Sequence, residues 1–473
     1  VVTGSNSFVT LVQRDTSVYD DAEEFIAFED EIVNEESWPP FSSDIPAKSS
    51  ADTMTLATRE FEFKFNPEDG EEIDSAFFKG GTLNYTLTSP FASQIAYTLT
   101  VTDVQDVSTG NTLVLTGTLV GGETSISDST PLEGKKNVAR REGSSNIFNV
   151  ELDLIFIIPP DMAIDASEEI TLEVVFEDAE FSAIFGSFDA DPVEVQQKVI
   201  RISVFDDFSD DGLFLTEPTA TLEFINTFGI EFGVSLANVK SVNSGVSEIL
   251  LTGAVTADLQ FVDAPNSSQL GESDITSIEM NVSNSNIDDL LSSTPDSLTF
   301  TVDATPNPPG SDNANNYLLD SSYLEIRTIV EVPLDLRMDG FSRDFTSSID
   351  GTELSDADSI TINLRTINEI PFDGTLDFSF QNDAGEVLYT LLGVESIESA
   401  EVGDDERTLR PVEKASVVRL NGEGIDAFLK TKKIIMTLNM STFDTESGKS
   451  VRIYSDYRID IFLTAQGKVA IDL

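Results

Sequence analysis

The sequence of 473 residues contains neither cysteine nor histidine. Without cysteine, the chain has no disulfide, no thiol nucleophile and no thiolate metal ligand. Without histidine, it lacks the commonest metal ligand and the commonest general base near neutral pH. These two absences exclude Ser-His-Asp, Cys-His and histidine-based zinc chemistry from this chain.

Basic residues are scarce: 27 Lys and Arg stand against 85 Asp and Glu, which gives a formal net charge of -58. Such a chain repels the phosphates of nucleic acid and of anionic lipid surfaces, so neither is expected as a partner. A strongly hydrated acidic surface keeps a protein soluble. It leaves cations and basic proteins as suitable partners.

Long apolar runs are also missing, and no segment approaches the ~18–20 continuous apolar residues that a membrane-spanning helix needs. The longest such run, "LIFIIPP" (154–160), is predicted to be a buried strand. The first residue is Val rather than Met, so we expect that a signal peptide or a lipid-anchor region precedes Val1.

Apolar residues make up 40% of the chain and include 32 Phe, which is enough for packed cores. One phrase occurs in three versions: "GGTLNYTLTSPFASQIAYTL" (80–99), "PTATLEFINTFGIEFGVSL" (218–236) and "DSITINLRTINEIPFDGTLDF" (358–378). Placing Ser89, Asn226 and Asn368 at one corner aligns the phrases at intervals of 137 and 142 residues. Alternating apolar residues on both sides of each corner predict strands with one buried face, joined as a hairpin.

We therefore predict an all-β chain of three tandem antiparallel β-sandwich domains with an N-terminal extended arm and few short helices. The expected domains are an arm at 1–57 packed on the first sandwich, then sandwiches at 58–196, 197–340 and 341–473. Short helices are expected at 286–293 and 424–433, and a hairpin at the C-terminus. Trp38, the only tryptophan, is expected to cover an apolar edge rather than to bind a ligand.

Several phrases together resemble an uncharacterised family of secreted or outer-membrane lipoproteins of Bacteroidota. They are "NSFVTLVQRDTSVY" (6–19), "FSAIFGSF" (181–188), "INTFGIEF" (225–232) and "VRIYSDYRIDIFLTAQGKVAI" (451–471). The resemblance implies an exported protein with a lipid-modified cysteine upstream of Val1, on the outer face of the outer membrane or secreted. It carries no catalytic residues to this chain.

The loop "DDFSDDG" (206–212) gathers the carboxylates of Asp206, Asp207, Asp210 and Asp211 and ends in glycine. Carboxylate oxygens are the ligands that Ca²⁺ prefers, so these four residues are candidate calcium ligands, although their spacing is not that of the usual calcium loop. No other cofactor is expected. A carboxylate pair for glycoside hydrolysis is an alternative, but almost every loop would supply one, and no pair can be singled out.

The segment "GKKNVARREG" (134–143) concentrates four basic residues, Lys135, Lys136, Arg140 and Arg141. In so acidic a chain, these residues are candidates for docking an acidic surface of a partner. The alternative is a solvated loop between strands.

No residue pattern indicates catalysis, and we expect a non-enzymatic cell-surface protein that binds another protein or adheres through its sandwich surfaces. The first alternative is a self-assembling subunit of a filament or surface layer. The second is a carbohydrate-binding or carbohydrate-active surface protein.

Overall fold

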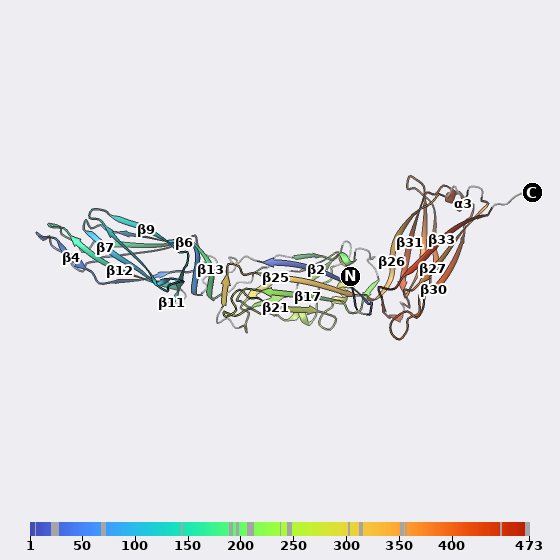
Figure 1. Ribbon diagram of the computed structural model, residues 1–473, viewed down its shortest axis with the longest axis horizontal. Coiled ribbons are helices and arrows are strands. Elements are labelled where there is room, and N and C mark those ends of the chain that lie inside the picture. Colours follow the sequence, from blue (N-terminus) through green and yellow to red (C-terminus); the bar gives the residue numbers. More distant parts are fainter. Residues whose placement is uncertain are drawn as a thin grey trace, which may run out of the picture.

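The computed structural model describes residues 1–473 except 5, 20–27, 68–71, 143–144, 189–192, 195–197, 206–211, 237, 244–247, 301–302, 312–315, 351–353, 355–356, 445–446 and 469–473. Figure 1 shows an elongated molecule in which three β-rich units follow one another along the long axis. Every strand pair in the described residues is antiparallel, and the chain is all-β with a few short helices, as predicted from the sequence.

The first unit is a sandwich whose two layers are joined at one end by β10, which pairs with both β6 and β7. One layer contains β4, β5, β12, β7 and β8, and the other contains β9, β6, β13 and β3. The strands of this unit are β3 (Glu31–Trp38), β4 (Asp52–Thr55), β5 (Arg59–Lys64), β6 (Glu72–Thr88), β7 (Gln94–Asp106), β8 (Thr112–Leu119), β9 (Ser125–Pro131), β10 (Lys135–Val138), β11 (Arg140–Glu142), β12 (Ser145–Ile158), β13 (Ile170–Ser187) and β24 (Asn316–Leu319). Trp38 is buried at the end of β3 with its ring 5.0 Å from that of Phe61, which confirms a packing role.

The middle unit combines one five-stranded sheet with two smaller sheets of four and three strands. Its elements are β1 (Val2–Thr3), β2 (Val9–Tyr19), β14 (Val193–Glu194), β15 (Lys198–Arg201), a 3₁₀ turn (Ser203–Phe205), β17 (Thr219–Asn226), β18 (Phe232–Ser235), β19 (Lys240–Val242), α1 (Ala254–Ala257), β20 (Gln260–Val262), β21 (Asp274–Met280), α2 (Ile287–Ser292), β22 (Ser297–Phe300), β23 (Asp303–Pro306) and β25 (Leu324–Pro333). The predicted helix at 286–293 is thus present as α2.

The last unit contains a sheet in the order β26-β31-β28-β29 and a second sheet in the order β30-β27-β33. Two short strands, β16 and β32, pair with the first residues of β26. The elements are β16 (Leu213–Leu215), β26 (Asp335–Ser348), β27 (Ser359–Asn368), β28 (Phe372–Gln381), β29 (Val387–Ile397), β30 (Val412–Arg419), α3 (Gly422–Leu429), β31 (Lys433–Thr442), β32 (Val451–Arg452) and β33 (Ile459–Lys468). The helix predicted at 424–433 is confirmed as α3, which begins two residues earlier and ends four residues earlier, at Leu429.

The repeated corner does not form a hairpin, which corrects the prediction. In each unit the strands before and after the corner do not pair with each other but lie in different layers: β6 and β7, β17 and β18, and β27 and β28. The chain crosses from one layer to the other, so the apolar faces of both strands meet in the core. In the first unit the buried hydroxyl groups of Tyr85 and Tyr97 are 2.8 Å apart across this core. Alternation reveals which face of a strand is buried but not which strand lies beside it.

The N-terminal arm is divided between two units, so the predicted packing of the whole arm on the first sandwich is wrong. Strand β3 pairs with β13 in the first unit, whereas β2 pairs with β25 of the middle unit from Thr10 opposite Pro333 to Tyr19 opposite Leu324. The apolar face of β2 fits either sandwich, and the sequence contains no signal for its partner. The domain boundaries remain predictions, and β26 runs continuously across residue 340.

The predicted C-terminal hairpin is also wrong. Strand β32 pairs with β26, while β33 pairs with β27 from Ser359 opposite Lys468 to Asn368 opposite Ile459. The two strands therefore belong to different sheets.

Candidate binding surfaces and inter-unit junctions

The corner residues Asn226 and Asn368 are completely buried, and their side chains form hydrogen bonds with backbone groups of the turn. The side-chain oxygen of Asn226 accepts a hydrogen bond from the N–H of Phe228 at 2.9 Å, and its amide donates to the carbonyl of Ile230 at 2.9 Å. Asn368 repeats this pattern with the N–H of Ile370 and the carbonyl of Phe372. Buried backbone groups need such partners, so this triplicated position is structural rather than a ligand site.

The predicted calcium ligands Asp206, Asp207, Asp210 and Asp211 lie outside the described residues. Within the part of the chain that the structure describes, no group of three or more Asp and Glu side chains is arranged to hold a metal ion. The calcium site remains a prediction.

The four basic residues predicted to dock a partner lie at the end of the first unit nearest the middle unit. Arg140 lies 3.1 Å from the buried carboxylate of Asp103, and Arg141 pairs with Glu72 and Asp74. Lys136 lies over the ring of Phe77 at 5.8 Å, and Lys135 is its half-buried neighbour on β10. The two arginines are thus occupied within the unit. A docking role for the group remains a prediction.

The junction between the first and middle units is built from main chain. Strand β24 extends the sheet of the first unit by pairing with Ala183 to Gly186 of β13, and after four intervening residues β25 begins in the middle unit. The N–H of Gly229, in the corner of the middle unit, donates to the carbonyl of Tyr317 on β24 at 2.9 Å. Because β24 is hydrogen-bonded on both sides, it ties the two units together.

Tyr317 is the central apolar contact of this junction and is completely buried. Its ring lies 6.0 Å from that of Phe185 in the first unit. A Cβ atom on Gly229 would lie only 2.1 Å from the Tyr317 ring, so this close approach requires glycine. Burial and nearby carboxylates raise the pKa of Tyr317, and its ring therefore stays neutral at physiological pH.

Two shallow polar grooves flank the same junction. One of about 420 Å³ is lined by residues that include Thr227, Glu272 and Tyr323, and a second of about 360 Å³ shares Ser321 to Tyr323 with it. Their walls are mainly hydroxyl and carboxylate groups. They contain a single aromatic side chain, Tyr323, and so offer little surface for stacking a sugar ring.

Charged side chains lie in the last unit where it meets the middle unit. Asp335, almost buried at the start of β26, accepts hydrogen bonds from Arg452 at 2.8 Å and from Thr216 at 3.2 Å. Burial alone would raise the pKa of Asp335, but hydrogen bonds from Ser450, Arg452 and Thr216, with the charge of Arg452, outweigh it and lower the pKa. The carboxylate is therefore held in its ionised form.

The N-terminal segment joins this second junction. The N–H of Val9 donates to the carbonyl of Ile453 at 3.1 Å, and the guanidinium of Arg407 donates to the carbonyl of Asn6 at 2.9 Å. Arg407 also lies over the ring of Tyr454 at 4.1 Å, and Tyr454 contacts Phe8 with ring centroids 5.8 Å apart. The N-terminal residues thus connect β2 of the middle unit to loops of the last unit.

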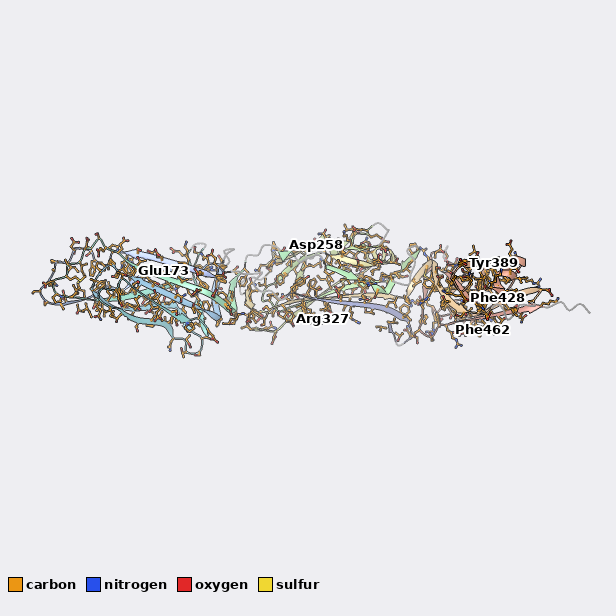
Figure 2. The ribbon with its side chains drawn as sticks, turned by 90° about the horizontal axis from the view of Figure 1, so that it is seen from above. Glu173, Asp258, Arg327, Tyr389, Phe428 and Phe462 are labelled. Atoms are coloured by element: carbon orange, nitrogen blue, oxygen red, sulfur yellow. The ribbon has the colours of Figure 1, made fainter. Side chains whose placement is uncertain are left out.

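The last unit contains an apolar cleft of about 330 Å³ between its two sheets. Its walls include Ile362, Phe378, Phe428, Leu463 and Ala465, from β27, β28, α3 and β33. Figure 2 places Phe428 and Tyr389 together in this unit, with Phe462 of β33 also on it. Sequence reasoning missed this cleft and both junctions, because each is made by strands that are distant in sequence.

Charge is distributed unevenly along the chain. Residues 1–340 carry 14 Lys and Arg against 61 Asp and Glu, whereas residues 341–473 carry 13 against 24. The last unit therefore holds almost half of the basic residues but remains net negative. None of the helices in the described part of the chain is long and apolar enough to cross a membrane.

Comparison with family models gives no match, and neither does comparison with curated proteins. Among solved structures, the chain is similar to a protein of Parabacteroides distasonis described provisionally as secreted, at 13% identity and a TM-score of 0.33, over 61% of this chain and 90% of that one. It is also similar to the family 11 carbohydrate-binding module of Clostridium thermocellum, at 10% identity and a TM-score of 0.11, over 35% and 96% of the two chains. A tandem pair of family 22 carbohydrate-binding modules from Paenibacillus barcinonensis matches at 9% identity and a TM-score of 0.14, over 65% and 98%. These values are too low to assign a family, a ligand or a function.

Proposed function

We propose that this chain is a non-catalytic protein of the cell surface or the extracellular space, a stiff rod of three sandwiches that binds another protein. The observation that carries this proposal is the way the units are joined. At both junctions a strand of one unit is hydrogen-bonded to its neighbour, so bending would break main-chain hydrogen bonds and expose apolar surface.

A rod of this kind holds a binding surface at a fixed distance from whatever carries the other end. Units joined by flexible linkers would instead sample many orientations, and relative motion is the usual expectation for small inter-domain interfaces. The net charge of -58 supports this role, because it favours a soluble molecule that does not associate non-specifically with copies of itself.

The residue inventory supports binding over catalysis. The chain has no Cys or His to act as nucleophile or base near neutral pH. Perturbed carboxyl groups such as Asp335 are paired with arginine at a junction rather than exposed in a cleft. The apolar cleft of the last unit has one carboxylate in its wall, Asp350, which is paired with Lys432 at 2.7 Å.

The proposal is tested by size-exclusion chromatography with light scattering, combined with small-angle X-ray scattering, on the full chain at several salt and calcium concentrations. We expect a monomer with one elongated scattering profile under every condition. Ordered growth with protein concentration or with calcium would contradict it and favour a self-assembling subunit. A profile that requires many bent conformers would contradict the stiff rod.

A further inference from the structure

The layer of the first unit that contains β9, β6, β13 and β3 has two edges of different composition. At one edge, the outward side chains of β9 and β6 are uncharged, and one pair of opposite hydroxyl groups is 2.9 Å apart. At the other edge, β3 faces β13 with Glu35 directly opposite Glu173. Glu31 lies opposite Glu177 on the same face. Because like charges directly opposite each other on neighbouring strands are destabilising, the edge at β3 is weakened by its own charges.

The two glutamate pairs are not equivalent. The carboxylate of Glu177 accepts a hydrogen bond from the side chain of Asn84 on β6 at 2.6 Å. Among the described residues, the carboxylates of Glu35 and Glu173 have no hydrogen-bond partner, and none of the four glutamates is in an ion pair. Glu173, labelled on the first unit in Figure 2, is half-buried, so water screens it less than the exposed Glu35. The main repulsion is therefore between Glu35 and Glu173.

Little apolar packing holds β3 in place against this repulsion. The side chains of β3 that lie opposite buried residues of β13 are Ile32, Asn34, Glu36 and Trp38. Only Ile32 and Trp38 are apolar. Asn34 instead exchanges two hydrogen bonds with the main chain of Lys64 on β5, at 2.8 and 3.0 Å, and Glu36 is exposed. Elements with few buried apolar contacts open locally at a lower free energy than the rest of a fold, so β3 is the weakly held edge of this layer.

We propose that β3 is a salt-dependent strap, which is bound to β13 when salt screens the glutamates and detaches when it does not. The Debye length is about 30 Å at 0.01 M salt and about 3 Å at 1 M. The Cβ atoms of directly opposite residues are only about 5 Å apart, so dilute salt leaves the repulsion and concentrated salt removes most of it. Release of β3 opens the edge of β13, and the salt concentration thus decides whether this layer has a free edge. This inference goes beyond the proposed binding role and does not depend on it.

The experiment measures amide hydrogen exchange of the full chain in sodium chloride at about 0.01 M and about 1 M, corrected for the intrinsic rate. We expect exchange in β3 to be about three- to tenfold faster in dilute salt, as two like-charged pairs imply. Strand β9 is the internal control, because it forms the other edge of the same layer and belongs to a chain with the same net charge. Its exchange should change by less than about twofold.

A series of charge variants locates the effect. Glu35→Gln should remove most of the salt dependence of β3. Glu35→Lys should reverse its sign, because a lysine then faces Glu173 and their attraction is strongest in dilute salt. Combining Glu35→Lys with Glu173→Lys restores two like charges, so β3 should again exchange faster in dilute salt. The matched control, Asp128→Asn, removes one negative charge from an exposed position on β9 and should leave the salt dependence of β3 unchanged. Circular dichroism verifies that each variant folds.

The inference is overturned if β3 and β9 respond equally to salt, if Glu35→Lys keeps the sign of the original salt dependence, or if Asp128→Asn acts like Glu35→Gln. Magnesium chloride at the same ionic strength should protect β3 as sodium chloride does. Full protection by about 1 mM magnesium would also overturn it, in favour of a cation bound between the carboxylates. The scattering profile of the rod stays unchanged in every case, because β24 still joins the first and middle units when β3 is detached.

Discussion

The two junctions of this rod join neighbouring units through different kinds of interaction. Between the first and middle units, β24 joins the sheet of one unit while Tyr317 is buried against Gly229 of the other. Between the middle and last units, the ion pair of Asp335 with Arg452 and the aromatic contacts of Arg407 hold loops around the start of β26. The first junction should therefore be insensitive to acid, whereas the second should loosen as the pH falls.

The largest expected effect comes from removing the apolar centre of the first junction. Tyr317→Ala deletes a completely buried aromatic ring, and we expect it to destabilise the chain by about 3–5 kcal/mol. Urea denaturation followed by tyrosine fluorescence measures the change. Gly229→Ala should also loosen this junction, because its Cβ has no space beside the Tyr317 ring. Wild-type stability in both variants would show that the junction is not tightly packed.

A second prediction concerns the corners, which have the same chemistry in two units. Asn226→Ala and Asn368→Ala each remove a buried amide that bonds the turning backbone, so each should destabilise its unit by about 3 kcal/mol. The Asn226 corner also touches β24, through Gly229, whereas the Asn368 corner does not contact the first junction. Hydrogen exchange of β24 should thus increase in Asn226→Ala only. Equal hydrogen exchange of β24 in both variants would show that the Asn226 corner does not stabilise the first junction.

Acid should loosen the second junction but not the first. The pKa of Asp335 is lowered in the folded chain, so its ionised form stabilises the junction above the ordinary pKa of 3.8, and this contribution is lost as the pH falls through the lower, folded value. Asp335→Asn should lose about 1–2 kcal/mol at pH 7 and remove most of the acid response of this junction. Hydrogen exchange in β32 and β16 between pH 5 and pH 2.5, corrected for the intrinsic rate, provides the measurement. If Asp335→Asn loosens in acid as much as the original chain does, other carboxylates cause the acid response.

The smallest expected effect is at an exposed ion pair across the first junction. Lys79 lies 3.4 Å from Asp320, and both side chains are 41% exposed, so water screens their interaction. Lys79→Gln should change the free energy of unfolding by less than about 0.5 kcal/mol. A loss as large as that of Asp335→Asn would mean that charge holds the first junction too.

The sequence was sufficient to predict the all-β class, the positions of the three corners, two of the short helices and the packing role of Trp38, but not that the strands at each corner lie in different layers. These features depend on local patterns, such as alternation, turn residues and capping. The partners of β2 and β33 could not be predicted, because an alternating strand fits the edge of any sandwich. The contacts of Arg407 with Tyr454 and of Arg452 with Asp335 could not be predicted either, because folding brings together residues that are distant in sequence.

The most direct test of the stiff rod is the distribution of distances between spin labels across each junction, measured by pulsed electron resonance. The chain has no cysteine, so pairs can be introduced without background. Glu142→Cys with Ser277→Cys spans the first junction, and Arg14→Cys with Val417→Cys spans the second, all at exposed positions. We predict one narrow distribution of distances for each pair at pH 7, and a broader one at pH 2.5 for the second pair only. Broad distributions for both pairs at pH 7 would contradict the stiff rod, because the units would then be joined by flexible hinges.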